Sequence, residues 1–574
     1  MSTPLKIFII YAREDKVYKD DLLKSLKMLQ NQGLVEPWHD SDIKPGDEWD
    51  KEIRSRLQTA DVILPIISFD FFNSDYIHRV EIVEAFKRYD RGEVLIVPVI
   101  ADACPWRHQP RFKDFQALPA DGKAINQWQD KKEAMTSIYE GLKGIVQEKV
   151  AQKKAAVQQI IDNGLKESDP QKQIKLYTRA IELDPGNAVP YNNRGSAKGT
   201  LGLHEAAIED FEKAISINPQ YASPYQNRGM AKLKSGQYRD AIEDFDYAIR
   251  LNPEFTEAYI NRGVAKNNLN QNKDALKDFN QALLIDPDNA LAFLNRGVAK
   301  FCLNQFEEAV KDYDRAIRIE PGNALAYHNR GLAKSNYGQY QEALDDYGKA
   351  IKLNPKYAQA YSNRGHVKNK LAKFQEAIKD FTQAIKINPK YADAYNNRGF
   401  AYRGLGMYAE AIKDFDKAVK LSPDYAKAYC NRGISRGMSG QYEEALADLD
   451  RAIALDPEYA DAYNSRGIAK GFLRQFHEAI QDFDQAIRIN PENVSAYYNR
   501  GVAKNDSGQF ESAIKDFNQA IRLSPEYADA HNSRGWTKEK LGRPDEARKD
   551  YELALSFNPG HKQAQINLNN LASE

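Results

Sequence analysis

The chain has 574 residues, 42% of them hydrophobic and 11% aromatic, which is enough for more than one folded domain. Its 81 Lys and Arg residues balance 81 Asp and Glu residues, so it lacks the long-range field that attracts nucleic acid or an anionic membrane. Three distant cysteines and nine scattered histidines form no disulfide or metal-ligand pattern, and the longest apolar runs have the length of strands. We therefore expect a cytoplasmic protein with no metal, no nucleic-acid partner and no membrane partner.

Strand and helix signals alternate through residues 5–150. The expected helices cover residues 17–33, about 47–60, 74–88 and 131–150, and the expected strands are LKIFIIY, VEPWHD, VILPIIS, VLIVPVIA and INQW. This alternation predicts a parallel five-stranded sheet that helices cover on both faces. No G-x-G-x-x-G or Walker loop follows the first strand, which excludes an ordinary dinucleotide or ATP site.

Ligands of such sheets bind at the carboxyl ends of the strands. Tyr11 ends the first predicted strand and Arg13 follows it, Asp40 ends the second, and Ser68 ends the third. We therefore expect these four side chains to line a substrate site.

The helix over residues 74–88 carries one carboxylate that its own sequence does not neutralise. Glu84 has Lys87 and Arg88 three and four residues downstream, the spacing at which helical charges meet. Glu81 instead shares its column with apolar residues, and His78 is its only possible polar companion. Two interpretations follow: a partly solvated surface glutamate, or a functional carboxylate.

Three stretches resemble the TIR domain family, in the order in which that family has them. IFIIYAREDKVYKDDLLKSL resembles the first box, WHDSDIKPGDEWDKEIRSRLQTADVILPIISFDFFNSDYIHRVE the second box with its loop and following helix, and VPVIADACPW the region after the fourth strand. The resemblance is closest to bacterial TIR domains and implies a flavodoxin-like α/β fold. The family contains assembly scaffolds and also enzymes that cleave NAD between nicotinamide and ribose.

The resemblance implies a role for individual residues. In the enzymes the essential glutamate ends an S-D-Y-x-x-x-x-E stretch, which selects Glu81 here. Tyr11 and Arg13 would line the substrate, and Asp40 and Lys44 belong to the mobile loop DSDIKPG. Nicotinamide leaves NAD as a neutral molecule, so one carboxylate that stabilises an oxocarbenium-like ribose suffices. We expect the isolation of Glu81 from lysines to keep its charge available, with NAD as substrate and no cofactor.

From residue 188 to residue 561 the chain repeats eleven times with a period of 34 residues, beginning with AVPYNNRGSAKGTLGLHEAAIEDFEKAISINPQY. The pattern has an aromatic at position 4, Gly at 8, Ala at 20 and 27, an aromatic at 24 and Pro at 32. It resembles the tetratricopeptide repeat, a helix-turn-helix unit that stacks into an all-α solenoid. We expect four segments: a TIR domain (1–150), a linker helix with a degenerate capping repeat (151–187), eleven repeats (188–561) and a C-terminal capping helix (562–574).

Two positions of the repeat predict a recurring ion pair. Position 7 is Arg and position 23 is Asp in all eleven units, and position 11 is basic in ten of them, Tyr402 being the exception. Such a pair specifies register better than it adds stability. A basic stripe for phosphates is the alternative, but this pairing and the zero net charge disfavour it.

Position 6 is Asn in nine of the eleven units. The resemblance places this position on the concave groove, where an amide offers a donor and an acceptor to any peptide backbone. The alternative is an amide that only satisfies the neighbouring repeat. The predicted peptide-binding residues are Asn193, Asn227, Asn261, Asn295, Asn329, Asn363, Asn397, Asn431 and Asn499.

The sequence thus predicts an effector and a sensor in one chain. A TIR domain would destroy NAD, by hydrolysis or cyclisation, and a tetratricopeptide superhelix would bind a protein or peptide and control the association of TIR domains. Bacterial proteins of this layout resemble anti-phage or stress-triggered systems. Two alternatives stay open: a non-catalytic scaffold for protein assembly, and a docking protein for chaperone or secretion partners that carries the TIR domain as a passenger.

Overall fold

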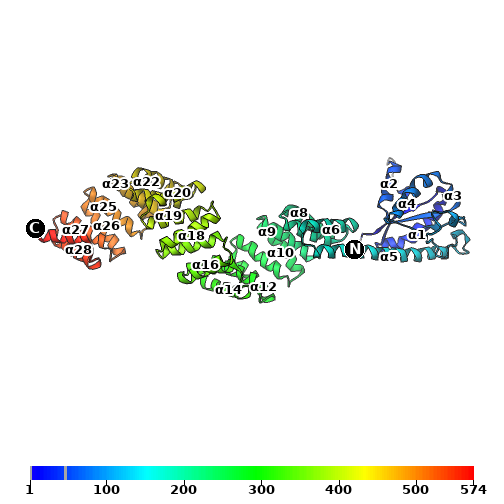
Figure 1. Ribbon diagram of the computed structural model, residues 1–574, viewed down its shortest axis with the longest axis horizontal. Coiled ribbons are helices and arrows are strands. Elements are labelled where there is room, and N and C mark those ends of the chain that lie inside the picture. Colours follow the sequence, from blue (N-terminus) through cyan, green and yellow to red (C-terminus); the bar gives the residue numbers. More distant parts are fainter. Residues whose placement is uncertain (1–2, 44–47, 574) are drawn as a thin grey trace. The chain divides into compact units, whose positions relative to one another are not determined.

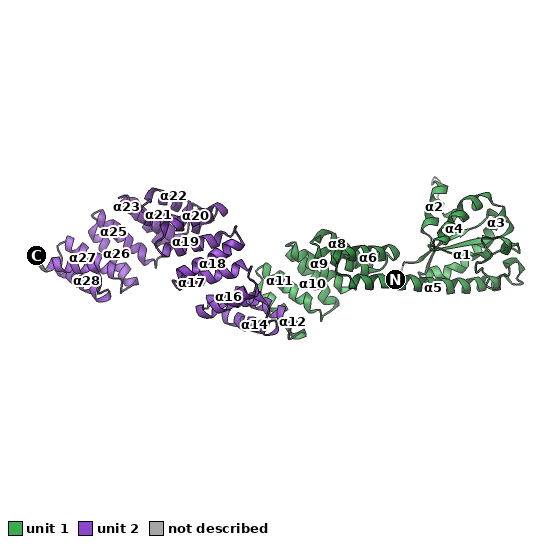
Figure 2. Cartoon of the chain, viewed as in Figure 1, with its two compact units in different colours: residues 1–287 green, residues 288–574 purple. Residues whose placement is uncertain are grey.

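The computed structural model describes residues 3–43 and 48–573 (Figure 1). The chain divides into two compact units, residues 1–287 and 288–574 (Figure 2). The first unit holds an α/β domain, a long helix and helical hairpins, and the second holds helical hairpins alone. Within the described residues, no helix combines the length and the apolar character needed to cross a membrane.

Parallel strands form the sheet of the α/β domain, in the order β2-β1-β3-β4, with β5 also paired to β3. Helices cover both faces, so all six residues of the central strand β3 are buried. The prediction of a five-stranded parallel sheet is confirmed. The strands are β1 Leu5–Ile10, β2 Val35–Trp38, β3 Val62–Ile67, β4 Leu95–Ile96 and β5 Val99–Ile100.

Two predicted strands differ in detail. VLIVPVIA forms two short strands, β4 and β5, on either side of Pro98, because proline has no N–H for the ladder. INQW forms a 3-10 helix, η5 (Ile125–Gln127), in which the Gln127 side chain accepts from the N–H of Ala124 at 3.3 Å. The fifth strand is therefore β5 and not INQW.

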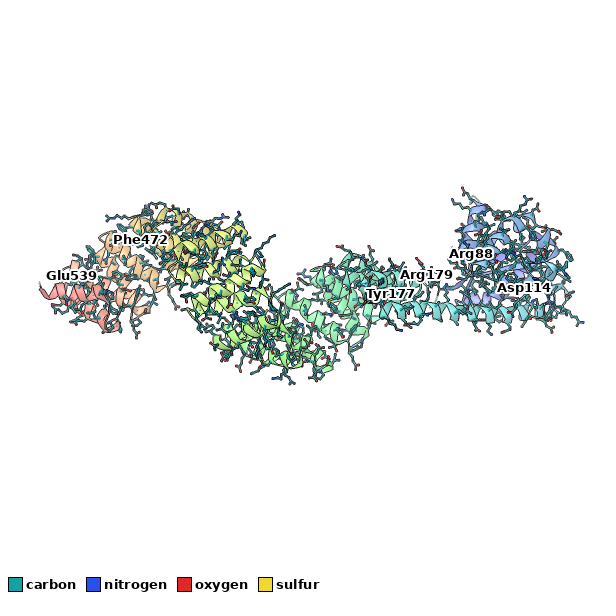
Figure 3. The ribbon with its side chains drawn as sticks, in the orientation of Figure 1. Arg88, Asp114, Tyr177, Arg179, Phe472 and Glu539 are labelled. Carbon is teal, nitrogen blue, oxygen red and sulfur yellow. The ribbon has the colours of Figure 1, made fainter. Side chains whose placement is uncertain are left out.

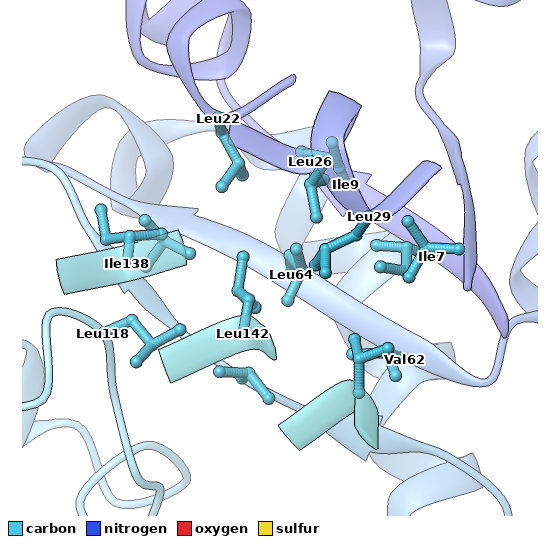
Figure 4. Packing of buried hydrophobic residues seen from close by; sticks show 14 of the residues in the cluster. Ile7, Ile9, Leu22, Leu26, Leu29, Val62, Leu64, Leu118, Ile138 and Leu142 are labelled. Carbon is cyan, nitrogen blue, oxygen red and sulfur yellow. The ribbon is translucent and has the colours of Figure 1, made fainter. Parts of the chain in front are cut away.

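Alternate residues of the strands point to two apolar clusters, one on each face of the sheet. On one face, Ile7, Ile9 and Leu64 pack against α1 and α5, whose labelled side chains in Figure 4 include Leu26 and Leu142. The other face packs against α2 and α4. The helices of the domain are α1 Lys16–Asn31, α2 Trp49–Thr59, α3 Phe69–Asn73, α4 Ile82–Asp90 and α5 Lys131–Lys166, and the short 3-10 segments are η1 Arg13–Asp15, η2 Asp40–Asp42 and η4 Trp106–His108.

Helix α5 continues well past its predicted end at residue 150. Its first half packs on the sheet, and its second half packs through Val157 and Ile161 against α6 (Pro170–Leu183). A Cβ added to Gly164 would lie 2.5 Å from the ring of Tyr177, labelled in Figure 3, so the two helices approach closely. One helix thus belongs both to the α/β domain and to the first hairpin.

Eleven further hairpins follow, each with a first helix of 13 residues and a second of 14. The small residues of the repeat let the two helices approach: a Cβ on Gly263, for example, would lie 2.6 Å from the Phe279 ring. Helix α29 (Lys562–Ser573) follows the last hairpin. The first helices are α7 Ala188–Thr200, α9 Ala222–Lys234, α11 Thr256–Asn268, α13 Ala290–Cys302, α15 Ala324–Asn336, α17 Ala358–Lys370, α19 Ala392–Gly404, α21 Ala426–Met438, α23 Ala460–Phe472, α25 Val494–Asp506 and α27 Ala528–Lys540. The second helices are α8 His204–Ile217, α10 Tyr238–Leu251, α12 Asn272–Ile285, α14 Phe306–Ile319, α16 Tyr340–Leu353, α18 Phe374–Ile387, α20 Tyr408–Leu421, α22 Tyr442–Leu455, α24 Phe476–Ile489, α26 Phe510–Leu523 and α28 Pro544–Phe557.

The predicted ion pair between positions 7 and 23 is confirmed in all eleven repeats. Arg194 donates through both Nε and Nη2 to the two oxygens of Asp210, at 2.9 and 2.7 Å, and the other repeats copy this geometry. Each aspartate is at most 6% exposed. The basic residue at position 11 reaches the same carboxylate at 2.7 to 3.0 Å in ten repeats, so every such aspartate except Asp414 has two cations.

Candidate functional site

Glu81 closes a π-helical turn, Ile77–Glu81, that leads into α4. The N–H of Ile82 donates to the carbonyl of Ile77, five residues back, which widens the helix at this point. Glu81 is 6% exposed and has no hydrogen bond or ion pair to any residue that the structure describes. Single π turns inside α-helices occur often at functional sites, and this one holds a buried carboxyl group without a partner.

The electrostatics of Glu81 follow from this burial. Removal from water, with a smaller contribution from the negative charge of Asp40, raises the pKa of Glu81 to about 8. Glu81 therefore holds its proton at neutral pH. The expectation that its charge stays available needs correction: the carboxylate forms above pH 8, or when a positive charge approaches it.

The contacts of His78 and Arg88 differ from those expected from regular α-helical spacing. His78 packs against the ring of Phe72, with centroids 6.0 Å apart, and the structure shows no hydrogen bond or ion pair between the described residues His78 and Glu81. Glu84 pairs with Lys87 at 3.7 Å, as predicted. Arg88, labelled in Figure 3, is instead buried and donates to backbone carbonyls at the end of α2, including that of Ala60 at 2.9 Å. Glu84 is thus neutralised by one cation and not by two.

Two predicted substrate-binding residues lie together beside Glu81. Tyr11 follows β1, Asp40 follows β2, and the Tyr11 hydroxyl donates to Asp40 Oδ1 at 2.5 Å. The Lys19 ammonium lies 5.2 Å from the centre of the Tyr11 ring. Burial, and then the bond to Asp40, raise the pKa of Tyr11. The charge of Asp40 also raises the pKa of Glu81, so the end of β2 lies within electrostatic range of the π turn.

Ser68 and Arg13 have other surroundings in the structure. Ser68 is fully buried: its hydroxyl donates to Asp15 Oδ2 at 2.6 Å and accepts from the N–H of Phe71 at 2.9 Å, capping α3. The prediction that Ser68 lines the substrate therefore needs correction, since its hydroxyl is used inside the fold. Arg13 lies exposed in η1, without an ion pair to a described residue, and Lys44 lies outside the described residues.

The sequence reasoning missed an aromatic pair next to the π turn. The rings of Trp49 and Tyr76 lie 4.4 Å apart, and the Tyr76 hydroxyl donates to Asp50 Oδ1 at 3.0 Å. Burial, followed by Asp50 and the charge of Glu81, raises the pKa of Tyr76. The signal was Tyr76 itself, which is the tyrosine of the S-D-Y stretch that selects Glu81.

The asparagines at position 6 use part of their hydrogen-bonding capacity between repeats. Four of them donate to the side chain at position 5 of the preceding repeat, which is the alternative role that the sequence left open for these amides. The acceptors are the polar side chains at position 5. These bonds run from Asn227 to Asn192 and from Asn431 to Asn396, both at 2.9 Å, from Asn499 to Asn464 at 3.1 Å, and between Asn363 and His328 at 2.9 Å.

A metal ion would need a group of ligating side chains close together. Across residues 3–43 and 48–573, no three His, Cys, Asp or Glu side chains are grouped closely enough to hold an ion.

Comparison with known families agrees with this architecture. The TIR domain model matches residues 7–136, and tetratricopeptide repeat models match segments from residue 188 to residue 561. This chain is a TIR-domain protein with tetratricopeptide (TPR) repeats.

Relatives match parts of the chain. An uncharacterized protein of Sinorhizobium fredii, y4lF, is 38% identical over 137 residues, which is 24% of this chain and 42% of that protein. The human small glutamine-rich tetratricopeptide repeat-containing protein beta is 47% identical over 51 residues, 9% of this chain and 17% of that protein. The chain thus spans less than half the length of either relative.

YrrB and Cut9-Hcn1 are among the solved structures that are similar to parts of this chain. YrrB, described as a TPR protein with an unusual peptide-binding site, is 26% identical, with a TM-score of 0.28, covering 32% of this chain and 95% of its own. The APC/C hetero-tetramer Cut9-Hcn1 is 15% identical, with a TM-score of 0.43. The match covers 72% of this chain and 96% of that chain.

Proposed function

We propose that the TIR domain cleaves the bond between nicotinamide and ribose in NAD, with Glu81 as the catalytic carboxylate. The observation that carries this proposal is the position of Glu81: buried in a π turn, without a partner among the described residues, and coupled to the Tyr11–Asp40 pair. A buried, strongly perturbed carboxyl group at the carboxyl ends of parallel strands is typical of a functional site.

The chemistry needs little from the protein besides this group. The bond between C1′ and the pyridinium nitrogen breaks, its electron pair stays on nitrogen, and nicotinamide leaves as a neutral molecule. The positive charge of the nicotinamide ring, and then of the ribose, favours the ionised form of Glu81, which stabilises the developing oxocarbenium ion. Water adds to C1′ and releases a proton to give ADP-ribose. Attack by a nitrogen of adenine gives a cyclic product instead.

We further propose that the TPR array binds a protein or peptide and thereby controls self-association of the TIR domains, as in bacterial anti-phage or stress-triggered NAD depletion. The groove-facing amides support binding to a peptide backbone. Since several of these amides also bond to the preceding repeat, both roles that the sequence left open are compatible with the same residues.

The experiment compares nicotinamide release by the wild type, Glu81→Gln and Glu84→Gln under activating conditions. Gln keeps the shape of the side chain and removes its charge, so Glu81→Gln should lose on the order of 100-fold or more in turnover. Glu84 lies on the same helix and already pairs with Lys87, so Glu84→Gln is the matched control and should keep most activity.

Circular dichroism of the three proteins controls for folding. Full turnover in Glu81→Gln, or no turnover by the wild type with any candidate partner, would contradict the enzymatic proposal and favour a TIR/TPR scaffold.

A further inference from the structure

One cavity in the TPR array is lined by more basic than acidic side chains. It has a volume of about 450 Å³ and is lined from the first helices of four successive hairpins, α17, α19, α21 and α23 (Figure 2). Lys370, Arg403 and Lys427 line it together with His366, against a single carboxylate, that of Asp461. The cavity is therefore cationic in a chain whose net charge is zero.

Arg403 is the central cation of this cavity. Its guanidinium donates to Asn431 Oδ1 at 3.2 Å and lies 5.0 Å from the centre of the Phe400 ring. It pairs with no carboxylate among the described residues. Burial lowers the pKa of Arg403, in agreement with a desolvated cation that lacks an acidic partner.

The repeat pattern explains how this cation comes to face the groove. In the other ten repeats position 11 is Lys or Arg and turns toward the buried aspartate at position 23. In this repeat position 11 is Tyr402 and the basic residue stands one place later, at position 12, where no other repeat has Lys or Arg. The shift moves a cation from the internal ion pair to the lining of the cavity.

A second and independent feature is an unused acceptor. Asn369 is 9% exposed, and its Nδ2 donates to the backbone carbonyl of Asn397 at 2.9 Å. Asn369 is one of the residues that line the cavity, and its buried Oδ1 accepts no hydrogen bond from a described residue. A buried amide oxygen without a donor is costly, and an incoming N–H would satisfy it.

We propose that this cavity binds an acidic peptide segment, with a carboxylate side chain on the Arg403 guanidinium and a backbone N–H on Asn369 Oδ1. This deepens the proposed function, on which it rests, by assigning the chemistry of the partner. Cations from α17, α19 and α21 are spread along the groove, which suits several carboxylates of an extended segment better than one terminal carboxylate. The exposed ring of Phe400 offers an apolar contact between them.

The test measures fluorescence anisotropy of a short labelled peptide of alternating Glu and Ala, amidated at its C-terminus, with the full chain. A peptide with Gln in place of Glu is the neutral probe.

Arg403→Met should weaken binding of the acidic peptide by about tenfold or more, since a charge-assisted bond is lost. Asp461→Asn should tighten it by on the order of threefold. Lys420→Met is the matched control: it removes one exposed cation from α20 in the same repeat and should leave affinity unchanged.

Several outcomes would overturn the proposal. These are equal affinity for the acidic and neutral peptides, undiminished binding by Arg403→Met, binding only when a free C-terminal carboxylate is present, or equally tight binding of a single-stranded oligouridylate. If Arg403→Met loses helical content, the test uses Arg403→Lys and Asp461→Asn instead. Unchanged affinity for the acidic peptide in both of these variants would overturn the proposal. NAD turnover is measured separately, so peptide binding without turnover would reject only the enzymatic proposal.

Discussion

Glu81 illustrates how one extra residue in a helical turn changes the chemistry of a side chain. In a regular α-helix it would share its column with Ile77 and Ala85, but the π turn alters this spacing and leaves the carboxyl group buried near Asp40. Burial and the charge of Asp40 favour the protonated form of Glu81 at neutral pH, and a cationic substrate would reverse that preference. Burial here costs stability and keeps a carboxyl group ready for a positive charge.

This cost predicts a stabilising substitution. The folded protein holds a proton on Glu81 up to about pH 8, whereas the unfolded chain releases it near pH 4.5. Between these values folding takes up a proton, so the wild type loses stability as pH rises. Glu81→Gln does not titrate and should be more stable above about pH 5, by on the order of 2 to 4 kcal/mol at pH 7.

Tryptophan fluorescence during urea unfolding measures this effect, because Trp38, Trp49, Trp106 and Trp128 lie in the TIR domain and only Trp536 lies elsewhere. Glu84→Gln is the control and should follow the wild type. Parallel pH profiles of unfolding free energy for wild type and Glu81→Gln would show that Glu81 is solvated.

At the scale of the helical hairpin, an ion network holds the two helices in register. Asp346 receives Arg330 and Lys334, the latter at 2.8 Å, whereas Asp414 receives only Arg398, because Tyr402 stands where the second cation would be. A buried aspartate carboxylate is destabilising unless a cation pairs with it. The network therefore maintains stability by giving each buried aspartate at least one cation.

The difference between these two hairpins predicts unequal effects of the same substitution. Arg398→Leu leaves Asp414 buried without a cation, a loss of roughly 3 to 5 kcal/mol. Arg330→Leu should cost less, because Lys334 still pairs with Asp346. Amide hydrogen exchange of α19–α20 and of α15–α16 measures the local stability of each hairpin.

Tyr402→Lys in the Arg398→Leu background is the control, since it supplies the missing cation and should recover part of the loss. Equal protection losses in the two hairpins would mean that the aspartates are solvated and that the network is not a stabilising feature.

At the scale of the whole molecule, the segment expected as a linker is a continuous helix. α5 runs from Lys131 to Lys166, and Lys153, in its middle, pairs with Asp61 of the TIR domain at 3.7 Å. The residues around position 150 therefore belong to a packed helix that serves both the TIR domain and the first hairpin. The division of the chain at this residue stays a prediction.

This continuity predicts resistance to proteolysis. Cleavage after Lys153 or Lys154 requires local unfolding of α5, so brief trypsin treatment should cut there more slowly than after Lys113, which is exposed in a turn. Mass spectrometry of the early fragments measures the order of cleavage. A first cut at Lys153 or Lys154 would show that the helix opens readily and that a flexible linker separates the two parts.

The sequence by itself determined the features that depend on a fixed spacing between residues. The period of 34, the small residues at positions 8, 20 and 27, and the Arg–Asp pair repeat within each hairpin, so the pattern of one unit predicts its contacts. The parallel sheet followed in the same way from alternating strands and helices.

Tertiary structure alone decided the features that depend on segments far apart in the chain. The effect of Asp40 on Glu81, the burial of Ser68 against Asp15 and the gathering of cations around Arg403 each arise from packing between separate elements, and the π turn at Glu81 was visible only in the structure. Sequence spacing places a side chain on a helix or at the end of a strand. The neighbours packed against it set its burial, its pKa and its partners, and these decide what it does.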